Sequence, residues 1–273
     1  MEIPFTKMHG LGNDFMVVRW PAGLAEPTAE RVRAWADRRH GVGFDQLLLV
    51  TEAPDAQADA AYRIFNADGS EVEQCGNGVR CIASLLGHES GTRLTLLSDG
   101  GLIEAELLGG GWVRVNYGEP NFDPDALPLL VPQAQDRYQL ELTSGRVEFG
   151  AVSVGNPHAV ILVDSVDAAP VGILGAELAT HPAFPRGVNV GFMQVQSETS
   201  VRLRVYERGV GETEACGTGA AAAAAVGRHW GILAEEVDVK LPGGTLTMRW
   251  PGPGTPLWQT GPTSTVFEGR IEL

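Results

Sequence analysis

The hydrophobic positions of this 273-residue chain fall mainly into short runs that are typical of β-strands. Continuous apolar runs such as 47–50 and alternating runs such as 201–206 predict strands. Two stretches, Val79–Leu86 and Ala220–Trp230, predict helices instead. The second opens with a run of alanines, the residue of highest helix propensity. After each predicted helix, strand-like runs flank a Gly-Gly turn.

This order of elements occurs twice, because the chain carries a weak internal repeat. Asn13 and Asn156 both follow a glycine and precede an apolar run, and they lie 143 positions apart. The motif Cys75-Gly-Asn-Gly matches Cys216-Gly-Thr-Gly at an offset of 141. Two copies that each span about half of the chain predict two similar domains, since a solenoid needs three or more short repeats.

The repeat leads to an expectation for the whole fold. A proline-rich stretch at 119–132 predicts a linker. We predict an α+β fold of two pseudo-symmetric domains, residues 1–118 and 119–261, with the tail from about 262 to 273 packing against the first. Each domain is expected to be a mixed or antiparallel β-sheet wrapped around a central helix, with the active site in the cleft between the domains.

The net charge of −14 restricts the partners of the chain. Such a surface repels polyanions, and the lysines, Lys7 and Lys240, form no basic stripe, so we expect no nucleic-acid partner. No apolar run is long enough for a transmembrane helix, and the N-terminus lacks the pattern of a signal peptide. We therefore expect no membrane partner and a cytoplasmic protein.

The cysteines are the candidate reactive groups. Three cysteines in a cytosolic chain argue against a disulfide framework. Cys75 and Cys216 each precede a predicted helix, whose N-terminus favours anions and lowers the pKa of a thiol. Inverting an α-carbon requires a base on one face and an acid on the other, which two domain copies can supply. We predict that Cys75 and Cys216 form this pair, and that Cys81 is a buried structural residue.

Other interpretations of these residues are weaker. A zinc site formed by Cys75, Cys216 and His158 lacks any pair at the usual ligand spacing, so we expect no metal. Pyridoxal phosphate requires a lysine, and neither Lys7 nor Lys240 lies in a phosphate-binding context. We expect no organic cofactor. His158 follows Asn156-Pro157 in the duplicated loop, and we interpret it as tuning a thiol pKa.

Four motifs resemble the diaminopimelate epimerase family: Met8–Phe15, Asn66–Cys81, Gly155–Val160 and Glu207–Gly219. The resemblance spans the chain. It implies epimerisation of LL-2,6-diaminopimelate to the meso form, a step of lysine and peptidoglycan precursor synthesis, and a homodimer.

The resemblance also implies roles for individual residues. Cys75 and Cys216 become proton donor and acceptor, and His158 and Glu207 tune the thiols. The implied substrate contacts are Asn13, Gln46, Asn66, Gly76, Asn77, Asn156, Asn189, Glu207, Arg208, Gly217 and Thr218. Arg208 suits a carboxylate, whereas Glu207 and the Asn side chains can accept from ammonium groups. A proline or hydroxyproline racemase and a non-catalytic amino-acid binding protein remain as alternatives.

Overall fold

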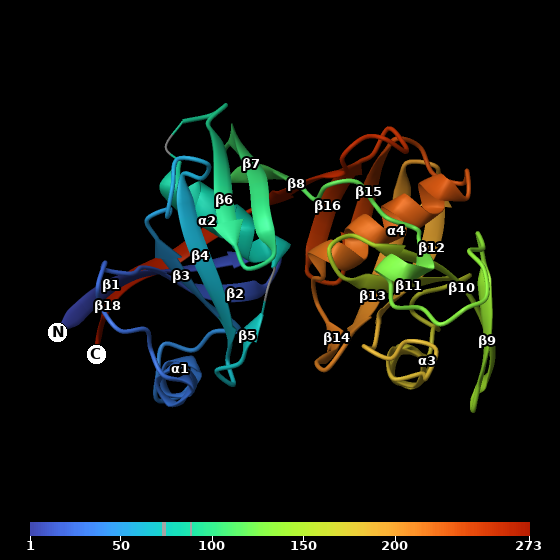
Figure 1. Cartoon of the computed structure of the whole chain (residues 1–273), viewed down its shortest axis with the longest axis horizontal. Coiled ribbons are helices and arrows are strands. Elements are labelled where there is room, and N and C mark those ends of the chain that lie inside the picture. Colours follow the sequence, from blue (N-terminus) through green and yellow to red (C-terminus); the bar gives the residue numbers. More distant parts are fainter. Residues whose placement is uncertain (73–74, 88) are drawn as a thin grey trace. The chain divides into compact units, whose positions relative to one another are not determined.

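The computed structural model describes residues 1–72, 75–87 and 89–273, and the chain divides into two compact units (Figure 1). Unit 1 consists of Met1–Val115 and Gly261–Leu273, and unit 2 of Asn116–Thr260. Both units combine a mixed β-sheet with few helices, which confirms the predicted α+β class.

Unit 1 holds most of its elements in the N-terminal part of the chain. They are β1 (Glu2–Gly10), β2 (Asn13–Arg19), α1 (Ala29–Ala36), β3 (Gln46–Thr51), β4 (Ala60–Asn66), β5 (Glu71–Val72), α2 (Gly76–Leu86), β6 (Arg93–Ser98), β7 (Gly101–Gly109), β8 (Trp112–Asn116) and β18 (Ser264–Glu272). The C-terminal strand β18 pairs with β1 in antiparallel orientation along nearly its whole length.

Unit 2 follows the same plan. Its elements are a 3₁₀ turn (Pro124–Ala126), β9 (Tyr138–Leu142), β10 (Gly145–Ser153), β11 (Pro157–Leu162), α3 (Val171–Ala179), β12 (Asn189–Ser197), β13 (Ser200–Glu207), β14 (Gly211–Thr213), α4 (Gly217–His229), β15 (Glu236–Leu241), β16 (Gly244–Arg249) and β17 (Trp258–Pro262).

The strand pairings repeat between the units. In unit 1, β2 pairs in parallel with β3 and β4 with β6, while β1–β2, β3–β4 and β6–β7 are antiparallel. In unit 2, β11–β12 and β13–β15 are the parallel pairs, and β10–β11, β12–β13 and β15–β16 are antiparallel. The internal repeat read from the sequence is therefore a repeat of sheet topology.

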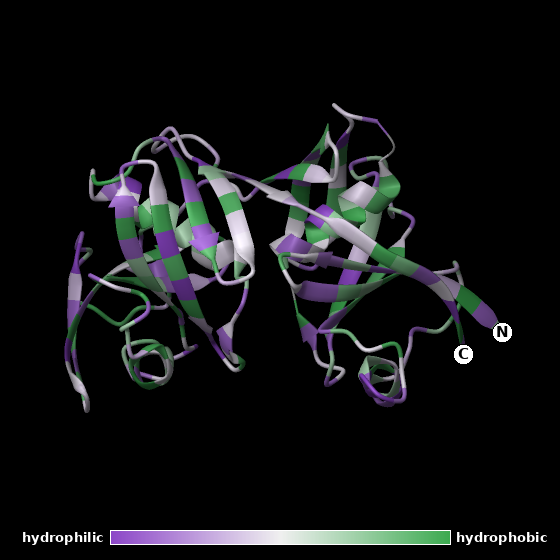
Figure 2. Cartoon of the chain, turned by 180° about the vertical axis from the view of Figure 1, so that it is seen from behind, coloured by the Kyte–Doolittle hydropathy of each residue, from purple (hydrophilic) through white to green (hydrophobic). Residues whose placement is uncertain are grey.

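A buried helix packs against the curved sheet of each unit (Figure 1). In unit 1, α2 packs against β1, β2, β3 and β7, and in unit 2, α4 packs against β10–β13, β15 and β16. The strands alternate between hydrophobic and hydrophilic positions (Figure 2), as expected of a sheet with one face toward a core. The alanines of α4 are all buried, because side chains of this size let the sheet close around the helix.

Both central helices begin three residues earlier than predicted. The predicted starts were Val79 and Ala220, whereas α2 begins at Gly76 and α4 at Gly217. The glycines, which appeared to be loop residues, serve close packing inside the helix. A Cβ atom on Gly219 would lie 2.8 Å from a methyl group of Val205. Cys75 and Cys216 are consequently the N-cap residues themselves.

The proline-rich stretch at 119–132 does not behave as a free linker. Asn121 forms an isolated antiparallel bridge with Ser153 on β10. Leu127 and Leu129 are buried in the core of unit 2. The segment is therefore an ordered part of unit 2, because its apolar side chains pack into that core.

Packing around α4 leads to a stability prediction at Gly227. A Cβ atom at this position would lie 2.2 Å from Cδ1 of buried Leu233. Overpacking a filled core costs about 1–3 kcal/mol, so Gly227→Ala is expected to lower the free energy of unfolding by this amount. Gly172 in α3 has nothing within 4 Å of a built Cβ. Gly172→Ala should instead stabilise by about 0.5–1 kcal/mol, since glycine is a poor helix former. Urea denaturation of both variants tests this contrast.

Candidate active site

Three of the predicted polar residues lie at one edge of the sheet in unit 1. Asn13 begins β2, and Gln46 begins the parallel neighbour β3. Asn66 ends β4 directly opposite Gln46 in the antiparallel register. The Gln46 side chain donates from Nε2 to Oδ1 of Asn66 over 2.9 Å. Strand direction and register thus bring together residues that are far apart in the sequence.

Unit 2 places its equivalents in the same way. Asn156 immediately precedes β11, Asn189 begins the parallel strand β12, and Glu207 ends the antiparallel strand β13. Nδ2 of Asn189 donates to the backbone carbonyl of Pro157 over 3.2 Å, and its Oδ1 accepts from the N–H of Arg208 at 2.9 Å. The Asn189 side chain therefore ties the start of β11 to the end of β13.

Cys75 lies beside this polar edge in unit 1. It is half-buried, and its Sγ lies 3.6 Å from Oδ1 of Asn13, an acceptor for the thiol proton. The same oxygen accepts from Nδ2 of Asn77 at 3.4 Å. Asn77 is in the first turn of α2 and is 2% exposed. The structure thus brings together the predicted residues Cys75, Asn13 and Asn77.

Cys216 occupies the equivalent place in unit 2 but is more deeply buried, at 4% exposed. Its Sγ accepts from the backbone N–H of Gly219 at 3.3 Å and lies 3.5 Å from Oγ1 of Thr218. The Glu207 side chain also forms a hydrogen bond with this thiol. Glu207 accepts a further hydrogen bond from the Thr213 hydroxyl over 2.5 Å.

The pKa of Cys216 corrects one sequence-based expectation. The helix N-terminus was expected to lower it, but burial, followed by the charge of Glu207, raises the pKa of Cys216 well above its usual range. The hydrogen bonds from Thr218 and Gly219 act in the opposite direction. Burial also raises the pKa of Glu207. Loss of hydration outweighs the helix end here, and burial cannot be read from the motif.

His158 is completely buried, and burial, with a smaller effect of the Arg208 charge, lowers its pKa to about 3. The ring is therefore neutral at physiological pH. Its Nε2 lies 2.9 Å from Oδ1 of Asn156, which can only accept, so Nε2 carries the proton. Nδ2 of Asn156 in turn donates to Oγ1 of Thr218 at 3.4 Å. His158 thus reaches the surroundings of Cys216 through Asn156 and Thr218.

The first turns of the two helices contain most of the remaining predicted contacts. The earliest helical hydrogen bonds run from Val79 and Ala220 to the carbonyls of the two cysteines. The residues in between carry the first N–H groups of each helix, and the N–H groups at a helix start are the ones that bind anions. The predicted carboxylate contacts belong to this set: Gly76, Asn77, Gly217 and Thr218.

Arg208, a further predicted contact, is exposed. Its Nη1 donates to the backbone carbonyl of Arg186 at 2.5 Å. Its guanidinium has further donors in a planar fork, the geometry that recognises a carboxylate.

Sequence reasoning missed an ionic network beside Asn13 in unit 1. Asp14 accepts from Lys7 and, in a two-pronged pair, from Arg38. Arg38 also contacts Asp45 at 2.7 Å. Burial acts to raise the pKa of Asp14, but hydrogen bonds and charges from Arg38 and Lys7 hold that pKa well below its usual range. Asp14 and Asp45 flank predicted residues in sequence, yet only the β2–β3 register shows that they meet.

The three thiols are expected to differ in reactivity toward iodoacetamide at pH 8. Cys75 is half-buried, whereas Cys216 is buried and its pKa is raised. Cys81 is 0% exposed, and burial raises its pKa to about 12. Because the exposed thiolate is the reactive form, labelling should follow the order Cys75, Cys216, Cys81. Peptide mass spectrometry over a time course measures this order, and early labelling of Cys81 would contradict its structural assignment.

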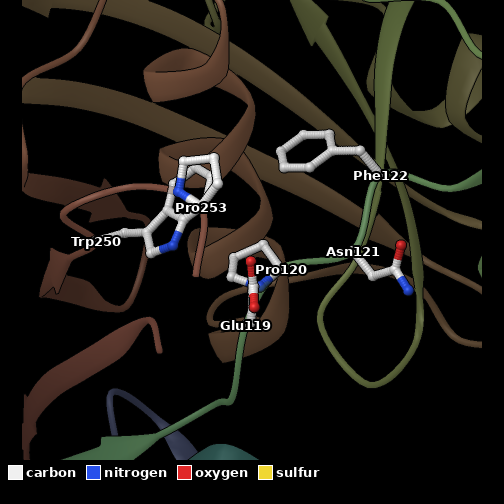
Figure 3. A pocket seen from close by; sticks show the side chains of 6 residues that line it. All are labelled: Glu119, Pro120, Asn121, Phe122, Trp250 and Pro253. Carbon is white, nitrogen blue, oxygen red and sulfur yellow. The ribbon is translucent and has the colours of Figure 1, made fainter. Parts of the chain in front are cut away.

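A cavity of about 420 Å³ in unit 2 lies elsewhere (Figure 3). Its lining residues are Glu119, Pro120, Asn121, Phe122, Trp250 and Pro253. The Phe122 ring stacks on His229, the last residue of α4, with ring centroids 4.4 Å apart. A helix of 13 residues is about 20 Å long, so this cavity lies far from Cys216 at the other end. None of the predicted site residues lines it.

Among residues 1–72, 75–87 and 89–273, no three His, Cys, Asp or Glu side chains are grouped as a metal site would require. In the same residues, no helix is long and apolar enough to cross a membrane.

The chain is similar to known proteins over its full length. The family model for diaminopimelate epimerase matches residues 5–122 and 150–266. A diaminopimelate epimerase of Alkalilimnicola ehrlichii is 51% identical over 282 residues, and one of Chromobacterium violaceum is 50% identical over 276, with 100% of both chains covered in each case.

Solved structures with a similar fold are more distant in sequence. A hydroxyproline epimerase from Agrobacterium vitis superposes with a TM-score of 0.72 at 19% identity, covering 99% of this chain and 92% of its own. A probable proline racemase from Agrobacterium radiobacter superposes with a TM-score of 0.71 at 18% identity, covering 99% and 93%. At these identities the likeness concerns the fold.

Proposed function

The chain belongs to the diaminopimelate epimerase family, and from that premise we propose that it converts LL-2,6-diaminopimelate into the meso form with Cys75 and Cys216 as its acid–base pair. The observation that carries the mechanism is the equivalent placement of the two thiols. Each is the N-cap of the buried helix of its unit. Asn13 contacts Cys75 directly, and its repeat equivalent Asn156 contacts Thr218, two residues after Cys216.

In this mechanism one thiolate removes the α-proton and the other thiol returns a proton to the opposite face of the carbon. The negative charge that develops is stabilised by the backbone N–H groups at the helix starts, which hold the α-carboxylate. The protonation states of the two cysteines exchange when the direction of the reaction is reversed. No step requires an organic cofactor or a metal.

The polar edges of the two sheets supply groups for the rest of the substrate. Diaminopimelate carries an ammonium and a carboxylate at each end. We assign the remaining carboxylate to Arg208 and the ammonium groups to Glu207 and the side-chain oxygens of the predicted Asn and Gln contacts. A site with these groups discriminates against a substrate without the second amino-acid end, because buried polar groups would remain unpaired.

The test is incubation of LL-diaminopimelate with reduced protein in deuterated water, without added cofactor. The expected result is the meso isomer with deuterium at the inverted α-carbon. Activity on proline or hydroxyproline, with none on diaminopimelate, would favour the racemase alternative. Binding of diaminopimelate without any exchange would favour the non-catalytic binding protein.

The same proposal includes a homodimer, as the family resemblance implies, and a location in the cytoplasm, as expected from the N-terminal sequence. Light scattering coupled to size exclusion, at protein concentrations used for activity, tests the assembly. A mass near the 29.0 kDa of one chain would contradict the dimer.

A further inference from the structure

The side-chain amide of Asn13 belongs to a chain of hydrogen bonds in which every donor points the same way. Arg80 donates from Nη2 to Oδ1 of Asn77 at 2.5 Å. Asn77 donates from Nδ2 to Oδ1 of Asn13 at 3.4 Å. Asn13 then donates from Nδ2 to Oδ2 of Asp45 at 3.1 Å.

The two ends of this chain fix its direction. A guanidinium has only donors, and a carboxylate has only acceptors. Arg80 therefore requires the oxygen of Asn77, and Asp45 requires the NH₂ group of Asn13. Reversing either amide would place donor against donor at Arg80 or acceptor against acceptor at Asp45. Amide orientation, which is ordinarily ambiguous, is thus determined by chemistry at both ends.

The fixed orientation has a consequence for Cys75. Its Sγ lies 3.6 Å from the oxygen of Asn13, which can accept a thiol proton but has nothing to donate to a thiolate. We propose that Arg80 and Asp45 are positioning residues that hold the Asn13 oxygen toward Cys75, so that this thiol is kept in its protonated, proton-donating form until substrate binds.

Unit 2 has no counterpart of this chain. The positions equivalent to Asn77 and Arg80, 141 residues further on, are Thr218 and Ala221. Asn156 is turned the other way, with its oxygen on His158 and its nitrogen toward Thr218. Cys216 has a donor in the N–H of Gly219 and an acceptor in the Glu207 side chain, and neither contact involves Asn156. The duplicated asparagine is therefore oriented differently in the two halves of the repeat, and only Asn13 presents its oxygen to the thiol.

Other groups also interact with Cys75, and the controls must separate their effects from the effect of Asn13. Tyr62 on β4 and Cys81 on α2 interact electrostatically with it, and Arg80 is completely buried in α2 near Cys81. Asp45 is the accessible end of the chain, with 46% of its side chain exposed, and its substitution is the one least expected to disturb folding.

The test measures the pH dependence of Cys75 alkylation in Cys216→Ala protein, with Cys81 modification excluded by mass spectrometry. Asp45→Asn lets the residue donate, which releases the amide of Asn13 to turn its NH₂ group toward sulfur. The alkylation midpoint should fall by about half a pH unit or more, the size of one hydrogen bond. Asp45→Glu, which remains acceptor-only, should keep the midpoint of unsubstituted Asp45.

Asp14→Asn is the matched control for charge, because it removes one negative charge from the same Arg38 and keeps an oxygen. A midpoint shift equal to that of Asp45→Asn would overturn the proposal, as would an unchanged midpoint in Asp45→Asn. In an Arg80→Gln background the effect of Asp45→Asn should increase, since Asn77 can then turn as well and its NH₂ group no longer opposes the reversed amide of Asn13. An effect of unchanged size would remove Arg80 from the proposal.

The proposal relies on Cys75 being one of the two acid–base residues, but its test does not depend on turnover. Alkylation needs neither diaminopimelate nor a second thiol. A protein inactive on diaminopimelate with the expected midpoint shifts would reject the proposed function alone. An active epimerase without these shifts would reject the positioning roles alone.

Discussion

Cys75→Ala and Cys216→Ala should each lose at least about a thousandfold in the rate of epimerisation, since each removes one proton-transfer residue of the pair. The more specific expectation concerns exchange with solvent. One remaining base can remove and return a proton only on its own face of the carbon. Each variant should therefore incorporate deuterium slowly with retention of configuration, and from only one stereoisomer. The two variants should use opposite stereoisomers, which chiral chromatography with mass detection measures.

Cys81→Ala is the matched control for these variants, because the same substitution is made at a buried thiol. Burial raises the pKa of Cys81 to about 12, so this thiol is not expected to transfer protons. It should retain turnover close to that of the unsubstituted protein. Exchange by Cys75→Ala or Cys216→Ala from both stereoisomers would contradict the assignment of one cysteine to each face.

Glu207→Gln should lower the pH at which Cys216 becomes a thiolate by about one unit or more. The Glu207 charge is, after burial, the largest cause that raises the pKa of Cys216. Glutamine keeps the shape but removes the like charge, so the thiolate becomes easier to form. In the direction that uses Cys216 as base, the pH–rate profile should shift to lower pH, and alkylation of Cys216 should show the same shift.

Glu212→Gln provides the comparison, because it neutralises a carboxylate on the neighbouring strand β14 that is paired with Arg204 instead. Its profile should coincide with that of the unsubstituted protein. Equal shifts in both variants would mean that overall charge, rather than contact with Glu207, sets the titration of Cys216.

The sequence predicted the repeat. It also predicted which residues occupy equivalent positions in the two halves, because strand register is duplicated along with the motifs. Leu47–Val50 and Val201–Tyr206 lie within β3 and β13, as their patterns indicated. The helix starts were misplaced because glycine has low helix propensity, and its value in close packing depends on neighbours such as Val205.

Electrostatics was harder to predict than topology. The motif around Cys216 shows a helix end, but the sign of the pKa shift depends on burial and on Glu207, which reaches the thiol through the fold. The direction of the hydrogen bonds through Asn13 depends on Asp45, 32 positions away. Such long-range contacts follow from sheet register, and local spacing does not reveal them.

The pairing of β18 with β1 also affects the order in which the chain folds during synthesis. Unit 2 is continuous from Asn116 to Thr260, whereas unit 1 needs residues 261–273 to complete its sheet. Domains usually fold as units, N-terminal first. Here the ribosome delivers the partner of β1 after all of unit 2, so unit 2 can finish first. Until then the edge of β1 is an unpaired strand that is open to association with other nascent chains.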